Sequence, residues 1–124
     1  MPRRIRDPRQ PRQVVKSQVR GITSAGQLKK LLQSNQKQQV FLKAYTNQCG
    51  HCRTIAPIYQ ELADKFPDAV FLEVDIGKVP EVKQKLGVKA TPQFHAFPAK
   101  QKVLTGGQPQ ALRQWVHQCM GGAV

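Results

Sequence analysis

The stretch TNQCGHCRTIAP, residues 46–57, places Cys49 and Cys52 two residues apart. It follows VFLKAY (40–45), which is apolar enough for a central strand, and it begins a helical pattern that we expect to end at about Phe66. The two cysteines are therefore expected where a strand meets a helix. They can be a redox pair, two ligands of a metal ion, or the remnant of either.

The first turn of a helix favours a reactive thiol. Backbone N–H groups without partners and the positive end of the helix dipole face the first sulfur. We therefore expect Cys49 to be an exposed thiolate with a lowered pKa, and Cys52 to be the buried resolving thiol. Cys49 would attack a substrate disulfide, and Cys52 would then release the product. When protonated, His51 would stabilise the thiolate and make the couple more oxidising.

The rest of the chain alternates between strand and helix patterns. Further strands are predicted over 14–22, 69–76, 93–97 and 102–105, the last two as a hairpin. Further helices are predicted after a cap at Thr23 or Ser24, from Pro80 to near Gly87, and from Pro109 to a stop at Gly121 and Gly122. This order predicts an α/β fold. We expect a central mixed sheet of about five strands with helices on both faces, parallel crossovers in the first half and an antiparallel end.

Two motifs resemble the thioredoxin superfamily. The CGHC motif, followed by Arg53, Ala56 and Pro57, is similar to the active-site helix of thioredoxins, and its Gly-His pair is typical of protein disulfide isomerase domains. The second motif, GVKATP (87–92), resembles the family's loop that ends in a cis-proline facing the cysteines. The resemblance therefore implies that the Thr91–Pro92 bond is cis and that this loop binds substrate backbone.

The resemblance covers roughly residues 20–120. It implies a thioredoxin-like domain over 21–124, preceded by a basic arm over 1–20. It also implies an enzyme, a protein-disulfide oxidoreductase without a cofactor, whose partners are protein thiols and disulfides. Cys49 would be the nucleophile, and Pro92 would orient the substrate. The implied catalytic residues are Cys49, Gly50, His51, Cys52, Thr91 and Pro92.

Four positions depart from the family's pattern. Gln48 stands where the family usually has Trp, and Gln93 follows the proline where a small or β-branched residue is more usual. Lys43 replaces a buried carboxylate that accepts a proton from the inner thiol, and Glu73 stands where the family often has a lysine. We expect Lys43 and Glu73 to form a half-buried ion pair. This exchange of charges is predicted to lower the thiol pKa values, to remove the direct base and to slow turnover at neutral pH.

The chain is strongly basic, with 20 Lys and Arg against 7 Asp and Glu and a net charge of +13. Seven basic residues and one acidic residue fall within residues 1–20. Prolines and a low apolar content predict an extended tail over about 1–13. Its simplest role is a solvated end. Alternatively, it binds RNA or an acidic protein, because arginine suits phosphate contacts, through Arg3, Arg4, Arg6, Arg9 and Arg12.

Two alternatives to the enzyme remain open from the residues. The chain can be an accessory subunit of a large assembly, such as a mitochondrial ribosome or a respiratory complex, anchored by its arm and keeping residual or sensing redox activity. A zinc site would need His117 and Cys119 beside the cysteine pair. We expect no metal, because His-x-Cys on an apolar-sided helix is poor ligand geometry. We also expect the last helix to pack on the far side of the sheet.

The sequence contains no apolar run long enough to span a bilayer. Its N-terminus lacks the apolar region of a secretory signal, and its end, GGAV, is not a retention tail for the endoplasmic reticulum. With three cysteines, a disulfide framework is not expected. These features predict an intracellular protein that is not secreted, with the mitochondrial matrix favoured over the cytosol.

Overall fold

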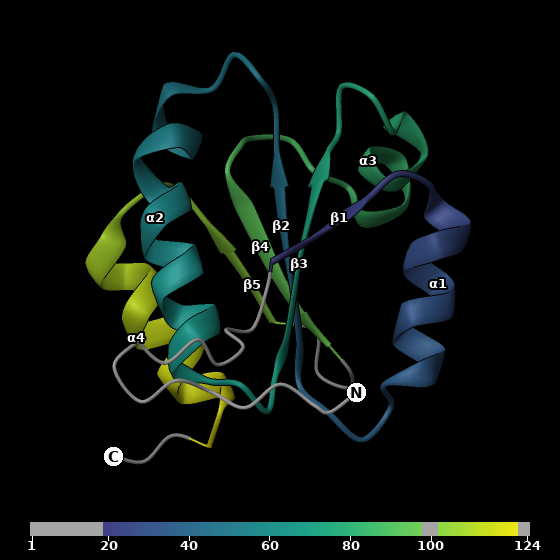
Figure 1. Cartoon of the computed structure of the whole chain (residues 1–124). Helices are drawn as coiled ribbons and strands as arrows, with labels where there is room; N and C mark the ends of the chain where they lie inside the picture. Colours follow the sequence, from purple (N-terminus) through teal and green to yellow (C-terminus); the bar gives the residue numbers. More distant parts are fainter. Residues whose placement is uncertain (1–18, 98–101, 122–124) are drawn as a thin grey trace, which may run out of the picture.

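The computed structural model describes residues 19–97 and 102–121, and its strands form one mixed sheet in the order β1-β3-β2-β4-β5 (Figure 1). The strands are β1 (Arg20–Ile22), β2 (Val40–Tyr45), β3 (Val70–Asp75), β4 (Gln93–Phe97) and β5 (Lys102–Thr105). The helices are α1 (Ala25–Ser34), α2 (Gly50–Lys65), α3 (Pro80–Leu86) and α4 (Pro109–Cys119). β1 and β2 lie parallel to β3, whereas β4 is antiparallel to both β2 and β5. The predicted α/β fold with a mixed sheet is confirmed.

Different pairs of helices cover the two faces of the sheet, α2 and α4 on one and α1 and α3 on the other (Figure 1). The apolar stripe of α4 packs into the same layer as α2, where the rings of Trp115 and Phe41 have centroids 5.5 Å apart. The expectation that the last helix lies on the far side of the sheet is therefore wrong. The helix α4 packs on that face because its apolar side completes the core that α2 begins, with Leu112, Trp115 and Val116.

Local signals in the sequence set most helix ends. Ser24 caps α1, because its side chain accepts a hydrogen bond from the backbone N–H of Gln27 at 3.0 Å. Pro80 occupies the first turn of α3, and Gly87 ends that helix in the left-handed conformation, with φ of +66°. The first strand is shorter than predicted, since β1 begins at Arg20, and residues 14–18 lie outside the described part of the chain. Within 19–97 and 102–121, no helix is both long and apolar enough to cross a membrane.

Candidate active site

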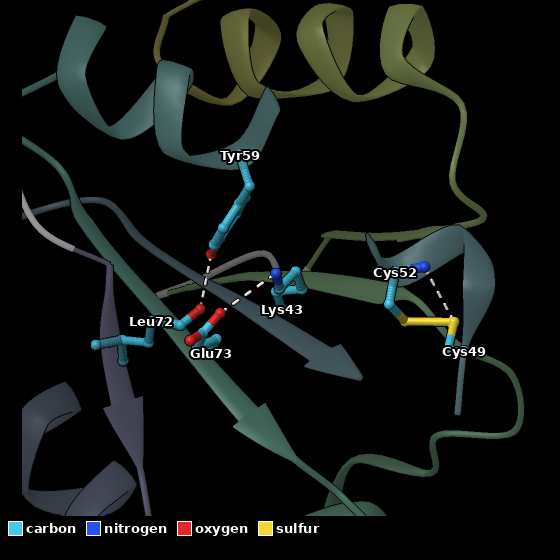
Figure 2. Close-up of polar contacts among 6 residues, drawn as sticks. All are labelled: Lys43, Cys49, Cys52, Tyr59, Leu72 and Glu73. Carbon is cyan, nitrogen blue, oxygen red and sulfur yellow. Dashed lines mark hydrogen bonds and ion pairs between the residues drawn. A yellow bond between two sulfur atoms is a disulfide. The ribbon is translucent and has the colours of Figure 1, made fainter. Parts of the chain in front are cut away.

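Cys49 and Cys52 form a disulfide at the N-terminal end of α2 (Figure 2). Their Cα atoms are 5.2 Å apart, within the range that a disulfide requires. Cys49 is the N-cap of the helix, and its Sγ accepts a hydrogen bond from the backbone N–H of Cys52 at 3.2 Å. Cys49 is half-buried, whereas Cys52 is only 5% exposed. The outer sulfur is therefore the one that a second protein can reach.

The apolar side of α2 fixes this position. Cys52, Ile55 and Tyr59 are buried at the spacing of one helix face, and that face rests on β2 and β3. The chain leaves β2 at Tyr45 and turns into the helix, and the backbone N–H of Cys49 donates to the carbonyl of Thr46 at 3.3 Å. The positive end of the helix dipole is thus directed at Cys49, where it stabilises a thiolate after reduction.

The loop after β5 connects the proline loop to the active-site helix. The Thr91–Pro92 bond is cis, as the motif implies, and the carbonyl of Pro92 accepts a hydrogen bond from the backbone N–H of Gly106 at 2.9 Å. The next residue, Gly107, lies against His51, because a Cβ added to the glycine would come within 2.8 Å of the Cβ of His51. No motif in the sequence identifies Gly107. Its contact with His51 joins two distant segments, so only the folded chain identifies it.

Lys43 is buried beneath α2 and paired with Glu73 (Figure 2). The two residues lie directly across from each other on the parallel strands β2 and β3. The Nζ atom of Lys43 is 3.3 Å from Oε1 of Glu73, and the side chains are 5% and 31% exposed. The predicted half-buried ion pair is confirmed.

Two tyrosine rings border this ion pair. The Nζ atom of Lys43 lies 5.3 Å from the ring centroids of both Tyr45 and Tyr59. The Tyr59 hydroxyl donates a hydrogen bond to the carbonyl of Leu72 at 2.8 Å. Burial and then the nearby Glu73 carboxylate raise the pKa of Tyr59, so this phenol stays neutral. Alternation along β2 places Tyr45 on the same face as Lys43, which is a signal that the sequence contains.

Tyr45 shares the electrostatic surroundings of Tyr59. Burial, followed by the carboxylates of Glu73 and Asp75, raises its pKa. Tyr59 follows Cys52 by two turns of the inward face of α2, which is the sequence signal for its place under the helix. The site therefore combines an accessible disulfide with a buried cation, the carboxylate that is paired with it and two neutral phenols.

The remaining predicted residues lie in different settings. Gly50 and His51 are exposed in the first turn of α2, and Gln48 is exposed just before Cys49. Gln93 is buried and donates through Nε2 to Oγ1 of Thr105 at 3.1 Å. Gln48 thus lies beside the disulfide, whereas Gln93 connects the proline loop to the neighbouring strand.

The alternative zinc set is not assembled by the described residues. The ring of His117 packs on Phe66 just after the C-terminal end of α2, with centroids 5.1 Å apart, while the cysteine pair lies at the other end of that helix. Among the described residues, no group of three or more His, Cys, Asp or Glu is placed to hold a metal ion. The predicted partner-binding residues lie outside the described part of the chain: Arg3, Arg4, Arg6, Arg9 and Arg12.

Comparison with known proteins matches the family described as Thioredoxin to residues 19–118. "Thioredoxin-2" of Pyricularia oryzae is 35% identical over 100 residues, which cover 79% of this chain and 57% of that protein. "Thioredoxin Asp f 29" of Aspergillus fumigatus is 36% identical over 98 residues, covering 76% of this chain and 88% of that protein. The crystal structure of Fasciola hepatica thioredoxin superposes with a TM-score of 0.77 at 28% identity, covering 81% of this chain and 98% of that one.

The chain spans less than two thirds of several curated relatives that match it. It covers 57% of the Pyricularia oryzae protein, 38% of a "Thioredoxin H-type" of Oryza sativa and 26% of a "Thioredoxin-like protein 1" of Schizosaccharomyces pombe. All of these relatives carry thioredoxin names. The matches do not favour the alternative of an accessory subunit that is anchored by its basic arm and keeps residual or sensing redox activity.

Proposed function

Because this chain belongs to the thioredoxin family, we propose that it is a thiol–disulfide oxidoreductase that acts on protein thiols and disulfides. The observation that carries this proposal is the Cys49–Cys52 disulfide at the start of α2. An accessible outer sulfur and a buried inner sulfur are the arrangement that two-step exchange requires.

The exchange proceeds through one mixed disulfide. With the site reduced, the Cys49 thiolate attacks one sulfur of a substrate disulfide, and the other substrate sulfur leaves as a thiolate that takes up a proton. The Cys52 thiolate then attacks the Sγ atom of Cys49 and expels the second substrate thiol. Two electrons pass to the substrate, and the site ends as the disulfide. The same steps in reverse oxidise a substrate dithiol.

The surrounding residues support this exchange in different ways. The helix N-terminus stabilises the Cys49 thiolate, and His51 adds positive charge when it is protonated. Thr91 and Pro92 are proposed to hold the substrate backbone, as the resemblance of their loop implies. Gly107 leaves room for His51 and so maintains the contact between the loop after β5 and the active-site helix.

The test is dithiol-driven reduction of a generic protein disulfide by the purified chain. We expect turnover in the native chain and only the background rate of the dithiol in Cys49→Ser. Cys52→Ser should accumulate the mixed disulfide, because the resolving thiol is gone. Cys119→Ser is the matched control, since this cysteine lies at the end of α4, and it should keep native turnover. A folded native chain without turnover, or an active Cys49→Ser, would contradict the proposal.

We also propose that the basic arm binds a polyanionic partner, RNA or an acidic protein within a larger assembly. The support is the density of arginine in residues 1–20. Removing residues 1–13 should release the chain from material that co-purifies with it, and binding to RNA should weaken steeply as salt rises. Unchanged co-purification after the truncation would contradict this role of the arm.

Localisation in the mitochondrial matrix, which the sequence favours over the cytosol, remains a proposal. Cell fractionation of the tagged full chain is the direct test. Recovery with matrix markers would support it, and recovery with cytosolic markers alone would contradict it.

A further inference from the structure

A buried positive charge lies in the layer between α2 and the sheet. Lys43 is the one Lys or Arg that is fully buried in the described part of the chain. Its neighbours on β4 and α2 are mainly apolar, since Phe94 lies across from it and Ile55 shares its layer. In such surroundings a charge acts over a longer range than it does at the surface. The pKa of any ionisable group close by therefore depends on this ammonium.

Cys52 belongs to the same layer. The inward face of α2 carries Cys52 at its start and Tyr59 two turns later, and Lys43 contacts the Tyr59 ring. In Figure 2 the Lys43 side chain lies between the disulfide on one side and the Glu73 carboxylate on the other. The ammonium is thus on the disulfide's side of the ion pair, and Glu73 is on the side away from it.

Water reaches the two charges of the Lys43–Glu73 ion pair to different extents. The Lys43 side chain is 5% exposed, whereas Glu73 is 31% exposed and is screened by water. The ion pair therefore produces a net positive electrostatic potential at Cys52. The ionisable side chains that face this layer from the surrounding elements are Tyr45 on β2, Glu73 and Asp75 on β3, and Tyr59 on α2. His51 and Arg53, the neighbours of Cys52 in the sequence, are exposed on α2.

A positive charge here acts on the two redox states differently. The disulfide is neutral, so Lys43 does not stabilise it. The reduced site holds a thiolate, and a nearby ammonium lowers the free energy of that state. Stabilising the reduced form makes a dithiol–disulfide couple more oxidising.

We propose that Lys43 is a positioning residue that stabilises the reduced site through Cys52, and so directs the exchange toward the oxidation of protein dithiols. This inference rests on the proposed function and adds its direction and substrate class. A substrate thiolate attacks the Sγ atom of Cys49, and Cys52 leaves as the stabilised thiolate. The second substrate thiol then displaces Cys49, and the substrate is released as a disulfide. Two electrons stay on the site, and a small-molecule disulfide of the glutathione class removes them to restore the Cys49–Cys52 bond.

The experiment is equilibration of the full chain with mixtures of glutathione and glutathione disulfide at neutral pH, followed by alkylation and mass measurement. Lys43→Met keeps the length and apolar stem of the side chain but removes its charge, and Lys43→Arg keeps the charge. We expect Lys43→Met to shift the equilibrium toward the protein disulfide by at least about threefold. This corresponds to about 14 mV, at about 30 mV for each tenfold change in a two-electron couple. Lys43→Arg should stay close to the native value.

A second measurement tests whether the effect of replacing Lys43 comes from the lost charge or from a change in structure. In the reduced chain, the thiolate absorbance should rise at a higher pH in Lys43→Met than in the native protein, because the ammonium no longer favours the anion. If Lys43→Met does not fold, the exchanged pair Lys43→Glu with Glu73→Lys takes its place, and it should shift the glutathione equilibrium in the same direction.

The outcomes distinguish this inference from the proposed function. An equilibrium constant unchanged in Lys43→Met, or one shifted toward the dithiol, would overturn the inference even if the native chain turns over substrate. A native disulfide that glutathione cannot reduce would also overturn the inference, because the couple would then be reducing rather than oxidising. Only the absence of dithiol-driven turnover in the native chain, or turnover in Cys49→Ser, would overturn the proposed function. A native chain that equilibrates reversibly, with the expected shift in Lys43→Met, supports the inference independently of any activity assay.

Discussion

The central sheet carries a buried polar cluster on each face, and the two clusters are built from different chemistry. On the face covered by α2 and α4, Lys43 and Glu73 are charged and form an ion pair. On the face covered by α1 and α3, Gln93 and His95 are joined by hydrogen bonds between neutral groups. The charged cluster lies beneath α2, and the neutral cluster follows the proline loop.

The neutral cluster is a short chain of three side chains. Nε2 of Gln93 donates to Thr105, which leaves its Oε1 to accept from Nε2 of His95 at 2.7 Å. The other ring nitrogen of His95, Nδ1, is buried and has no hydrogen-bond partner among the described residues. Burial lowers the pKa of His95, because a proton on this ring would place a charge in apolar surroundings.

The comparison shows two ways of placing polar atoms inside a sheet. A buried charge needs an opposite charge close by, and removing that partner is costly. A neutral cluster needs only hydrogen bonds, but it is stable only while its imidazole stays neutral. The charged cluster should therefore be sensitive to the loss of one partner, and the neutral cluster should be sensitive to acid.

The largest effect is expected from breaking the ion pair. Glu73→Gln leaves Lys43 buried without its counter-charge, and the free energy of unfolding should fall by about 2–3 kcal/mol, less than for a fully buried pair because Glu73 is partly exposed. Lys43→Met should change it by no more than about 1 kcal/mol, since the remaining carboxylate can be hydrated. Urea denaturation of both variants is the measurement. Equal losses of stability in the two variants would contradict this expectation, because they would show that the two charges cost the same to leave unpaired.

A smaller loss is expected at the phenol beside the charged cluster. Tyr59→Phe removes the hydrogen bond to the Leu72 carbonyl and leaves that acceptor buried, so the free energy of unfolding should fall by about 1 kcal/mol. The same urea denaturation experiment gives the value. The ring remains in place, and a loss near zero would mean that the carbonyl finds another donor.

Acid should distinguish the neutral cluster. The folded-state pKa of His95 is lowered, so the unfolded chain binds its proton more readily. The stability that His95 contributes is therefore full above its unfolded pKa of about 6.5 and is lost as the pH falls through the folded value. Between a pH above this range and a pH below it, the melting temperature should fall more in the native chain than in His95→Leu. Parallel decreases would contradict a role for His95.

The smallest effect is expected at the exposed end of the neutral cluster. Thr105→Val keeps the shape of the side chain and removes the acceptor for Gln93. Because Thr105 is exposed, water can replace its hydroxyl, and the free energy of unfolding should fall by no more than about 0.5 kcal/mol. Urea denaturation under the conditions used for Tyr59→Phe makes the comparison direct. A loss as large as that of Tyr59→Phe would show that the cluster is sealed from solvent.

The sequence predicts the charged cluster better than the neutral one. Lys43 and Glu73 are departures from the family's pattern at two positions whose charges are exchanged, and this exchange predicts their ion pair. The cysteine pair and the proline loop are likewise local motifs. Gln93 is identified only as a departure from a family pattern, because its partners come from the strand pairing that folding creates.

Other features depend on packing that no local pattern records. The side of the sheet that α4 occupies is decided by the fit of Trp115 into the core beside Phe41. The contact of Gly107 with His51 depends on how the loop after β5 folds back over α2. Both require the relative placement of segments that are far apart in the sequence, so periodicity and capping signals do not determine them.

The pairing of Lys43 with Glu73 also bears on which alignment of β2 and β3 the chain selects as it folds. Two parallel strands of mostly apolar residues can change their pairing register at little cost in free energy when all neighbouring side chains are similarly apolar. Here a slip of one residue would set Lys43 against Leu72 or Val74 and leave both charges unmatched. Misaligned pairings of β2 with β3 are therefore unfavourable in the centre of the sheet, and the two residues of the buried ion pair also select the correct strand register.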